Sequence, residues 1–317
     1  MDQKTFAELE YDHKKRKTRR EKFLERMEEL IPWKRLEDRI RRHYPKAGRG
    51  RHPYPLRVML RVHCVQLFYN LSDPAMEDLL YEVESVRRFV GLRLSDALPD
   101  ETTILNFRRR LERHGLGELL LKEINRHLSK DGVTLKTGTI VDASIVAAPS
   151  STKNAEAARD PEMHQAKKGN EWHFGMKVHI GVDDVTGCVH SVVGTAANVA
   201  DITQVDQLLH GGELRVRGDA GYQGVHRREE HSGSCINWLI AMKPGARRRL
   251  PAGSKEALAE RAMAQVRARV EHPFRYLKDV FGYRKVRYRG LGKNMNRVSL
   301  LLGFANLLIA DSRSRRR

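Results

Sequence analysis

The pattern of apolar and polar positions divides the chain into two parts with different periods. Up to about residue 131, apolar residues recur every three to four positions, which predicts amphipathic helices. Within this part, Leu56 to Leu71 is apolar nearly all round and predicts a buried central helix. From Thr137 onward the period changes to two, which predicts strands. We therefore expect an α+β protein with an all-helical domain over residues 1–131 and an α/β domain over residues 132–317, built on a mixed sheet with flanking helices.

The clearest strand prediction covers Trp172 to Ile180, where every second residue, beginning with the tryptophan, is apolar and is expected to be buried. The residues VDDVTG that follow have the composition of a tight turn, so we interpret Asp183 and Asp184 as hairpin residues and not as metal ligands. The segment before the strand, residues 148–171, is polar and without period, which predicts a loop. Asp201 precedes a short periodic stretch and is interpreted as a helix cap.

Two predicted strands each contain an aspartate in an unusual place. Residues 138–148, GTIVDASIVAA, form an apolar run in which Asp142 is the lone charge, and a buried carboxylate needs a partner such as a metal ion. Residues 214–224, LRVRGDAGYQG, alternate and then present Asp219 beside glycines at the exposed end of a strand. Taken alone, that second position is more typical of a turn residue or a helix cap.

A long helix is predicted from about Ser254 to Gly282, with an apolar stripe in steps of three and four. The stripe consists of Leu258, Ala262, Val266, Val270, Phe274, Leu277 and Phe281. Arg267, Glu271 and Lys278 fall on one polar edge beside this stripe, which on its own is typical of a solvated edge with an i,i+4 ion pair. Pro273 predicts a bend close to Glu271.

The net charge indicates a polyanionic partner. Lys and Arg number 59 against 40 Asp and Glu, a formal charge of +19. Nucleic acid is the natural partner for such a surplus, although binding to a ribosome or to a membrane surface would fit the charge equally well. The block KKRKTRR, residues 14–20, is typical either of a solvated segment or of one that binds nucleic acid without regard to sequence.

Two sets of basic residues are candidates for contact with a DNA backbone. The helix predicted over residues 100–115 has a basic face, which is typical either of a solvated amphipathic helix or of one that reads the major groove. The polar loop before the clearest strand contributes lysines that are either solvated or bound to phosphate. The candidates are Arg108, Arg109 and Arg110 on the helix and Lys153, Lys167 and Lys168 in the loop.

The cysteines and histidines suggest no structural metal. Cys64, Cys188 and Cys235 are scattered without a CxxC pair, so neither a disulfide framework nor a zinc site is expected, and free thiols favour a cytoplasmic location. The histidines of the predicted hairpin lack the i,i+4 helical spacing of a zinc protease. No signal-peptide pattern opens the sequence, and no apolar run reaches the roughly 18 residues typical of a membrane span.

Taken together, these motifs resemble a known family. The aspartate in IVDASIVAAPSSTKN, the second in GDAGYQG and the glutamate in RARVEHPFRYLK are similar to the catalytic core of bacterial insertion-sequence transposases of the DDE class, in the IS-five group. The segments DETTILNFRRRLERHGLG, KKGNEWHFGMKVHIGVD and TAANVAD also resemble family segments, in family order. Arg267 and Lys278 match the family's extended signature around Glu271, whereas Ala264 stands where the family has tyrosine.

The resemblance implies a ribonuclease H-like catalytic domain preceded by a helical domain for DNA binding and dimerisation. Asp142, Asp219 and Glu271 would be catalytic and would hold two Mg²⁺ ions, which Mn²⁺ can replace. Arg267 and Lys278 would bind DNA near the ions. The protein would bind transposon terminal inverted repeats, nick the ends and join the 3′-hydroxyl to target DNA.

The same resemblance implies where the protein works and with what. It would act on double-stranded DNA as a homodimer or higher oligomer, without a membrane, in the bacterial cytoplasm at the nucleoid. Two alternatives stay open. A ribonuclease H-like nuclease without strand transfer would use the same triad, and a host-adopted DNA-binding protein without catalysis would keep the basic surface.

Overall fold

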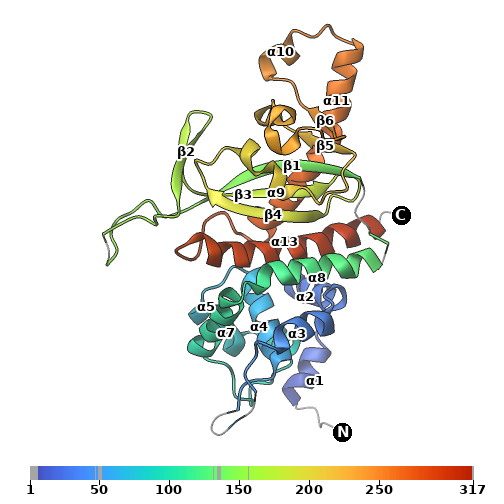
Figure 1. The fold of residues 1–317 in the computed structure, drawn as a ribbon. Coiled ribbons are helices and arrows are strands. Elements are labelled where there is room, and N and C mark those ends of the chain that lie inside the picture. Colours follow the sequence, from blue (N-terminus) through green and yellow to red (C-terminus); the bar gives the residue numbers. More distant parts are fainter. Residues whose placement is uncertain are drawn as a thin grey trace.

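The chain forms a helical layer and a mixed β-sheet, with two long helices side by side between them (Figure 1). The computed structural model describes residues 6–46, 48, 52–130, 132–133, 137–155 and 157–315. The first part of the chain is helical, as the apolar period predicts. Its helices are α1 (Phe6–Asp12), α2 (Arg19–Leu30), α3 (Trp33–Arg41), α4 (Leu56–Phe68), α5 (Asp73–Glu82), α6 (Glu84–Val90), α7 (Glu101–Arg113) and α8 (Leu116–Lys130).

Local sequence signals set the ends of several of these helices. Thr18 and Glu21 form a reciprocal capping box at the start of α2. The Asp100 side chain accepts the N–H of Thr103 at 2.7 Å and begins α7, the helix predicted from residue 100. Gly91, with φ of +79°, ends α6 in the left-handed conformation that glycine adopts without strain. The predicted central helix is α4, and nearly all of its side chains are buried.

The second part of the chain forms the mixed sheet that the alternating pattern predicts. Its strands are β1 (Gly138–Ala147), β2 (His164–Lys168), β3 (Glu171–Asp183), β4 (Val189–Ala196), β5 (Arg215–Gly218) and β6 (Asn237–Ile240). The strand order is β4-β3-β1-β5-β6, with β2 pairing the first residues of β3. The pairs β4-β3 and β3-β1 are antiparallel, whereas β1-β5 and β5-β6 are parallel.

The remaining elements are short turns and helices after β4, an irregular helical segment from α11 to η6, and the long helix α13. They are η1 (Asp201–Gln204), α9 (Val205–Leu208), η2 (Ala220–Tyr222), η3 (Val225–Arg227), η4 (Glu229–His231), α10 (Pro244–Arg248), α11 (Lys255–Arg267), η5 (Ala268–Val270), α12 (Glu271–Arg275), the π-helical turn η6 (Tyr276–Val280) and α13 (Leu291–Ser314). Among the residues described, none of the helices is both long enough and apolar enough to cross a bilayer.

Helix α13 joins the two layers. It packs along α8, and its buried side chains belong to a core that continues from the helical layer to one face of the sheet (Figure 1). Asn306 of α13 accepts the N–H of Val189 at 2.8 Å, which fixes the helix to β4. Asp311, near its end, pairs with Arg26 of α2. The predicted domain boundary at residue 131 lies outside the described residues, and on either side of it the layers share this core.

Three predictions about the second part need correction. Residues 164–168, predicted as loop, form strand β2, and Trp172, predicted to be buried, is 66% exposed. Both differences arise because β2 and the start of β3 project beyond the body of the sheet (Figure 1). The helix predicted over residues 254–282 exists, but its stripe is buried only from Val270 onward, and Leu258 is 53% exposed. The reason is that α11 extends past the edge of the sheet, so the start of its apolar stripe faces solvent, although Glu260 on another face is buried (Figure 1).

Candidate active site

Asp142 and Asp219 lie at the same level of two adjacent parallel strands. In the β1-β5 ladder Ile140 stands opposite Arg217, and each aspartate follows two residues later on its own strand. Asp142 Oδ1 accepts the N–H of Ala143 at 2.8 Å, and Asp219 Oδ1 accepts the N–H of Gly221 at the same distance. The parallel register therefore brings together two carboxylates that are 77 residues apart in the sequence.

Glu271 comes to the same place from the helical segment that follows β6. It is the first residue of α12, directly after the 3₁₀ turn η5. Its neighbours Val270 and Phe274 are buried in the core that includes residues of β1, while Glu271 is exposed. The change from 3₁₀ to α and then to π geometry around Pro273 is the irregularity that the proline predicts.

The electrostatics of Asp142 show that the three carboxylates share one site. Burial, and to a lesser degree the negative charges of Asp219 and Glu271, together raise the pKa of Asp142 from 3.8 to about 7. The Ala143 N–H and the charge of Arg267 act in the opposite direction. The structure thus brings the sequence-predicted Asp142, Asp219 and Glu271 close enough for their charges to interact, with Arg267 beside them.

Lys278 borders this site from the π-helical turn. Its ammonium group donates to Ser144 Oγ at 2.7 Å, two residues along β1 from Asp142. Burial lowers the pKa of Lys278, and the charges of Lys168 and Arg284 lower it further. Lys278 therefore stands where the resemblance predicts a basic residue, and Lys168 is near enough to act on it.

Two residues near the site, Tyr222 and Asp201, have surroundings that the sequence analysis did not predict. The Tyr222 side chain is 1% exposed, and its hydroxyl has no hydrogen-bond partner among the described residues. Burial raises its pKa, as do the charges of Asp142, Asp201 and Asp219. Asp201 makes no side-chain cap bond to its own turn, contrary to the prediction, and pairs instead with Lys177 at 2.8 Å. Both residues lie in segments that resemble the family, GDAGYQG for Tyr222 and TAANVAD for Asp201, and this position could have indicated them from the sequence.

Asp183 and Asp184 lie in the β3-β4 turn, as predicted, but they are not solvated. Asp183 Oδ1 accepts the N–H of Thr186 at 2.5 Å. Asp184 is 2% exposed and receives Arg215 Nε at 2.7 Å and Arg217 Nε at 3.3 Å. These guanidinium groups hold the pKa of Asp184 below its ordinary value despite burial. The aspartate therefore neutralises two arginines that the alternation of β5 predicts on its polar face.

The predicted DNA-binding arginines of α7 differ in accessibility. Arg109 is exposed and Arg110 partly buried, with one N–H donated to His43 O at 3.1 Å. Arg108 is 8% exposed and pairs with Asp73 at 2.8 Å and with Glu112 at 2.7 Å. A phosphate contact by Arg108 is incompatible with this burial, so its prediction was wrong. The helical period placed Arg108 on the polar face, but the neighbouring α5 covers that position.

The predicted lysines of the second part are all exposed. Lys153 lies in the loop after β1, and Lys167 and Lys168 lie on β2. Their charges are available to a ligand in solvent.

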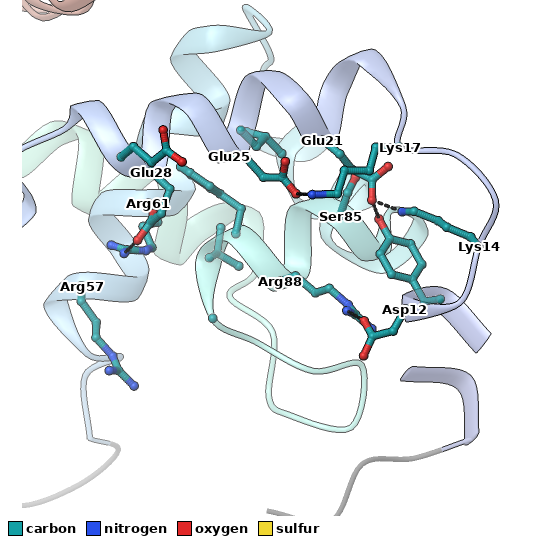
Figure 2. A pocket seen from close by; sticks show the side chains of 16 residues that line it. Asp12, Lys14, Lys17, Glu21, Glu25, Glu28, Arg57, Arg61, Ser85 and Arg88 are labelled. Atoms are coloured by element: carbon teal, nitrogen blue, oxygen red, sulfur yellow. Dashed lines mark hydrogen bonds and ion pairs between the residues drawn. The ribbon is translucent and has the colours of Figure 1, made fainter. Parts of the chain in front are cut away.

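A cavity of about 770 Å³ lies away from the carboxylates, between α1, α2, α4 and α6 (Figure 2). Lys17 of the predicted basic block pairs there with Glu25 at 2.6 Å, and Lys14 pairs with Glu21. Part of the block is therefore neutralised by α2 and is not freely solvated. The cavity lining contains charges of both signs and none of the triad.

A second group of possible metal ligands is tied up in hydrogen bonds. His190, His210 and Glu213 place ligand atoms within 4.8 Å of one another near the starts of β4 and β5. Thr139 Oγ1 lies 3.1 Å from His190 Nε2 and donates to Glu213 at 3.1 Å, and the N–H of Gly211 donates to the same carboxylate at 2.8 Å. The group links β1, β4 and the segment before β5 by hydrogen bonds and is separate from the triad.

Comparison with known proteins identifies the class to which this fold and site belong. The family described as Transposase DDE domain matches residues 134–307, more than half of the chain, and that described as Transposase domain (DUF772) matches residues 11–110. The chain belongs to the DDE transposases. With both domains present it is an insertion-sequence transposase, an enzyme of DNA transposition that acts on DNA with the help of divalent metal ions.

One solved structure is also similar. It is described as the crystal structure of the Mos1 strand transfer complex, and the similarity covers 77% of this chain and 82% of that chain, at 12% identity and a TM-score of 0.19.

Proposed function

We propose that Asp142, Asp219 and Glu271 are the catalytic triad and that they hold two Mg²⁺ ions, which Mn²⁺ can replace. The observation that carries this proposal is the meeting of three carboxylates from β1, the end of β5 and the start of α12, where their charges raise the pKa of Asp142. Like charges crowded in a partly buried place are costly without a cation. Carboxylate oxygens are also the ligands that Mg²⁺ prefers, so the donor set fits the ion.

The chain's own residues divide the work at this site. When bound, the ions would activate the attacking oxygen and stabilise the leaving oxygen at phosphorus. Asp142, on strand β1, is affected by the charges of both other carboxylates and is our choice for the ligand shared by both ions. Arg267 and Lys278 hold the DNA backbone beside them through charge and do not transfer protons. Hydrolysis of a transposon end and attack by the freed 3′-hydroxyl on target DNA are the same in-line displacement, so one site serves both.

We assign the catalytic domain to the ribonuclease H-like class and the chain to the IS-five group. The strand order β4-β3-β1-β5-β6, with an antiparallel half and a parallel half, supports the first assignment. The motifs around the triad support the second. Residues 1–131 are then the helical domain for DNA binding and dimerisation and residues 132–317 the catalytic domain.

The basic surface supports the proposed contacts with transposon ends and target. Lys153, Lys167 and Lys168 are exposed, Lys168 acts electrostatically on Lys278, and Arg109 is exposed on α7, our candidate for the reading helix. We infer a homodimer or higher oligomer on DNA at the nucleoid, because one chain offers one triad and transposition must coordinate two ends.

The test of this function is a strand-transfer assay. Purified protein, Mg²⁺ and a labelled duplex carrying the inverted repeat that flanks the reading frame are incubated with a supercoiled target plasmid. We expect nicked ends and also covalent joining of the label to the plasmid. Nicking without joining would support the nuclease alternative, and binding without nicking would support the silent DNA-binding protein.

A further inference from the structure

The hairpin formed by β2 and the start of β3 projects from the sheet into solvent (Figure 1). Gly169, with φ of +63°, lets the chain reverse between the two strands. Lys167 stands directly opposite Trp172 in the ladder. The tryptophan is 66% exposed, whereas a side chain of this size is normally well buried. The hairpin therefore holds a large aromatic surface in water.

One face of this hairpin places a cation beside an aromatic ring. Residues opposite each other share a face of a sheet, so Lys167 and Trp172 lie on the same face as Phe174. The guanidinium of Arg159 lies over the Phe174 ring, 5.4 Å from its centroid. The acidic Glu171 pairs with Lys168 in the ladder and lies on the opposite face.

The hairpin is also connected to the triad. The later residues of β3 pair with β1, with Ile180 opposite Asp142. Lys168 acts electrostatically on Lys278, which donates to Ser144 close to Asp142. The hairpin is therefore linked electrostatically, through Lys168, to the basic residue beside the triad.

We propose that the β2-β3 hairpin grips the DNA end at the active site, with Lys167 on a backbone phosphate and the Trp172 ring stacked on an unpaired base of that end. The proposal rests on the proposed function. Charge complementarity favours DNA as the occupant, since Lys167 lies directly opposite the ring on the same face. A base freed from the helix has a flat apolar face that matches an indole ring, whereas an intact duplex offers only edges, sugars and phosphates.

The experiment compares binding of the full chain to two duplexes of one sequence, the first fully paired and the second with three unpaired bases at one end. We expect wild type to prefer the second duplex and Trp172→Ala to reduce that preference about tenfold, because base stacking on an aromatic ring is worth about a tenfold or greater factor in affinity. Trp172→Phe keeps most of the preference. Lys167→Ala weakens binding to both duplexes alike and lowers the salt dependence by about one counterion.

A matched control is Tyr81→Ala, which removes another exposed aromatic ring, 54% exposed on α5. This variant should keep the preference for unpaired bases. A wild-type protein without any preference, or a Trp172→Ala variant that keeps all of it, would overturn the proposal. If Trp172→Ala instead changes the molar mass in light scattering without DNA, the ring contacts a second copy and the proposal is wrong.

A separate assay distinguishes this failure from failure of the proposed function. Wild-type nicking of labelled end DNA with Mg²⁺ tests the triad directly. Nicking by wild type together with an unchanged preference in Trp172→Ala would remove the hairpin proposal and leave the catalytic one standing. Absence of nicking by wild type, together with the expected loss of preference in Trp172→Ala, would remove the catalytic proposal and leave the binding of unpaired bases by the hairpin standing.

Discussion

Replacing Asp142 by asparagine should stabilise the metal-free protein. The ordinary pKa of 3.8 rises to about 7 in the fold, chiefly through burial and then through the charges of Asp219 and Glu271. Each tenfold change in proton affinity corresponds to about 1.4 kcal/mol, so ionising Asp142 costs the fold up to about 4 kcal/mol. Asparagine removes the charge and keeps an oxygen that can accept the N–H of Ala143.

The gain should depend on pH with a definite sign. A carboxyl whose pKa is raised by folding costs almost nothing below its unfolded pKa near 4; the cost grows as pH rises from about 4 to about 7 and is constant above that. The advantage of Asp142→Asn should therefore be small at pH 4.5 and about 2 to 4 kcal/mol at pH 8. Added Mg²⁺ should narrow the difference at pH 8, because the cation favours the ionised wild type.

Urea unfolding in a metal chelator at the two pH values measures this difference. Asp206→Asn is a matched control, since Asp206 is an exposed carboxylate on α9, and it should change stability by less than about 0.5 kcal/mol at either pH. A destabilised Asp142→Asn at pH 8, or an equal gain at both pH values, would show that the three carboxylates do not repel one another as described.

Other variants test neighbouring features. Asp184→Ala should lower the free energy of unfolding by about 3 kcal/mol, because it leaves Arg215 and Arg217 without their buried partner, and urea unfolding that shows less than about 1 kcal/mol would contradict the ion pairs. Tyr222→Phe should raise metal-free stability by about 1 kcal/mol, because it removes a buried hydroxyl without a partner, and a clear loss on denaturation would mean that the hydroxyl is bonded. Lys278→Met should slow end cleavage about tenfold or more while the melting temperature stays within a few degrees, and unchanged cleavage would exclude its contact with DNA.

The sequence predicts the parts of the site that depend on local pattern. The runs that contain Asp142 and Asp219 form strands β1 and β5, and the helical segment predicted from Ser254 begins there with α11. That segment continues through η5 into α12, where Glu271 and Pro273 lie. These features follow from period and from capping residues, which act within a few positions along the chain. The meeting of the three carboxylates follows only once the parallel register of β1 and β5 is known.

The errors concern what covers each residue, which depends on distant segments. Alternation predicted a buried Trp172. The start of β3 extends beyond the other strands, so its side chains still alternate but Trp172 is left exposed. The same holds for Leu258 at the projecting end of α11. Arg108 shows the opposite error. It lies at a polar position of its helix and was expected to be exposed, but it is buried in an ion pair with Asp73 of α5. Burial of Asp184 could not be predicted either, since its partners lie on β5.

The most direct test of the account is a nicking assay on labelled end DNA with Mg²⁺, run on wild type, Asp142→Asn, Asp219→Asn, Glu271→Gln and Asp183→Asn. Each triad variant should bind the DNA as well as wild type and lose nicking and joining, because its shape is kept and a charge that holds the cations is removed. Asp183→Asn should keep most activity, since Asp183 Oδ1 accepts N–H groups of the β3-β4 turn and Asp183 is not one of the three triad carboxylates. Wild-type nicking in any triad variant, or loss of nicking in Asp183→Asn equal to that in Asp142→Asn, would show that the catalytic carboxylates are not these three.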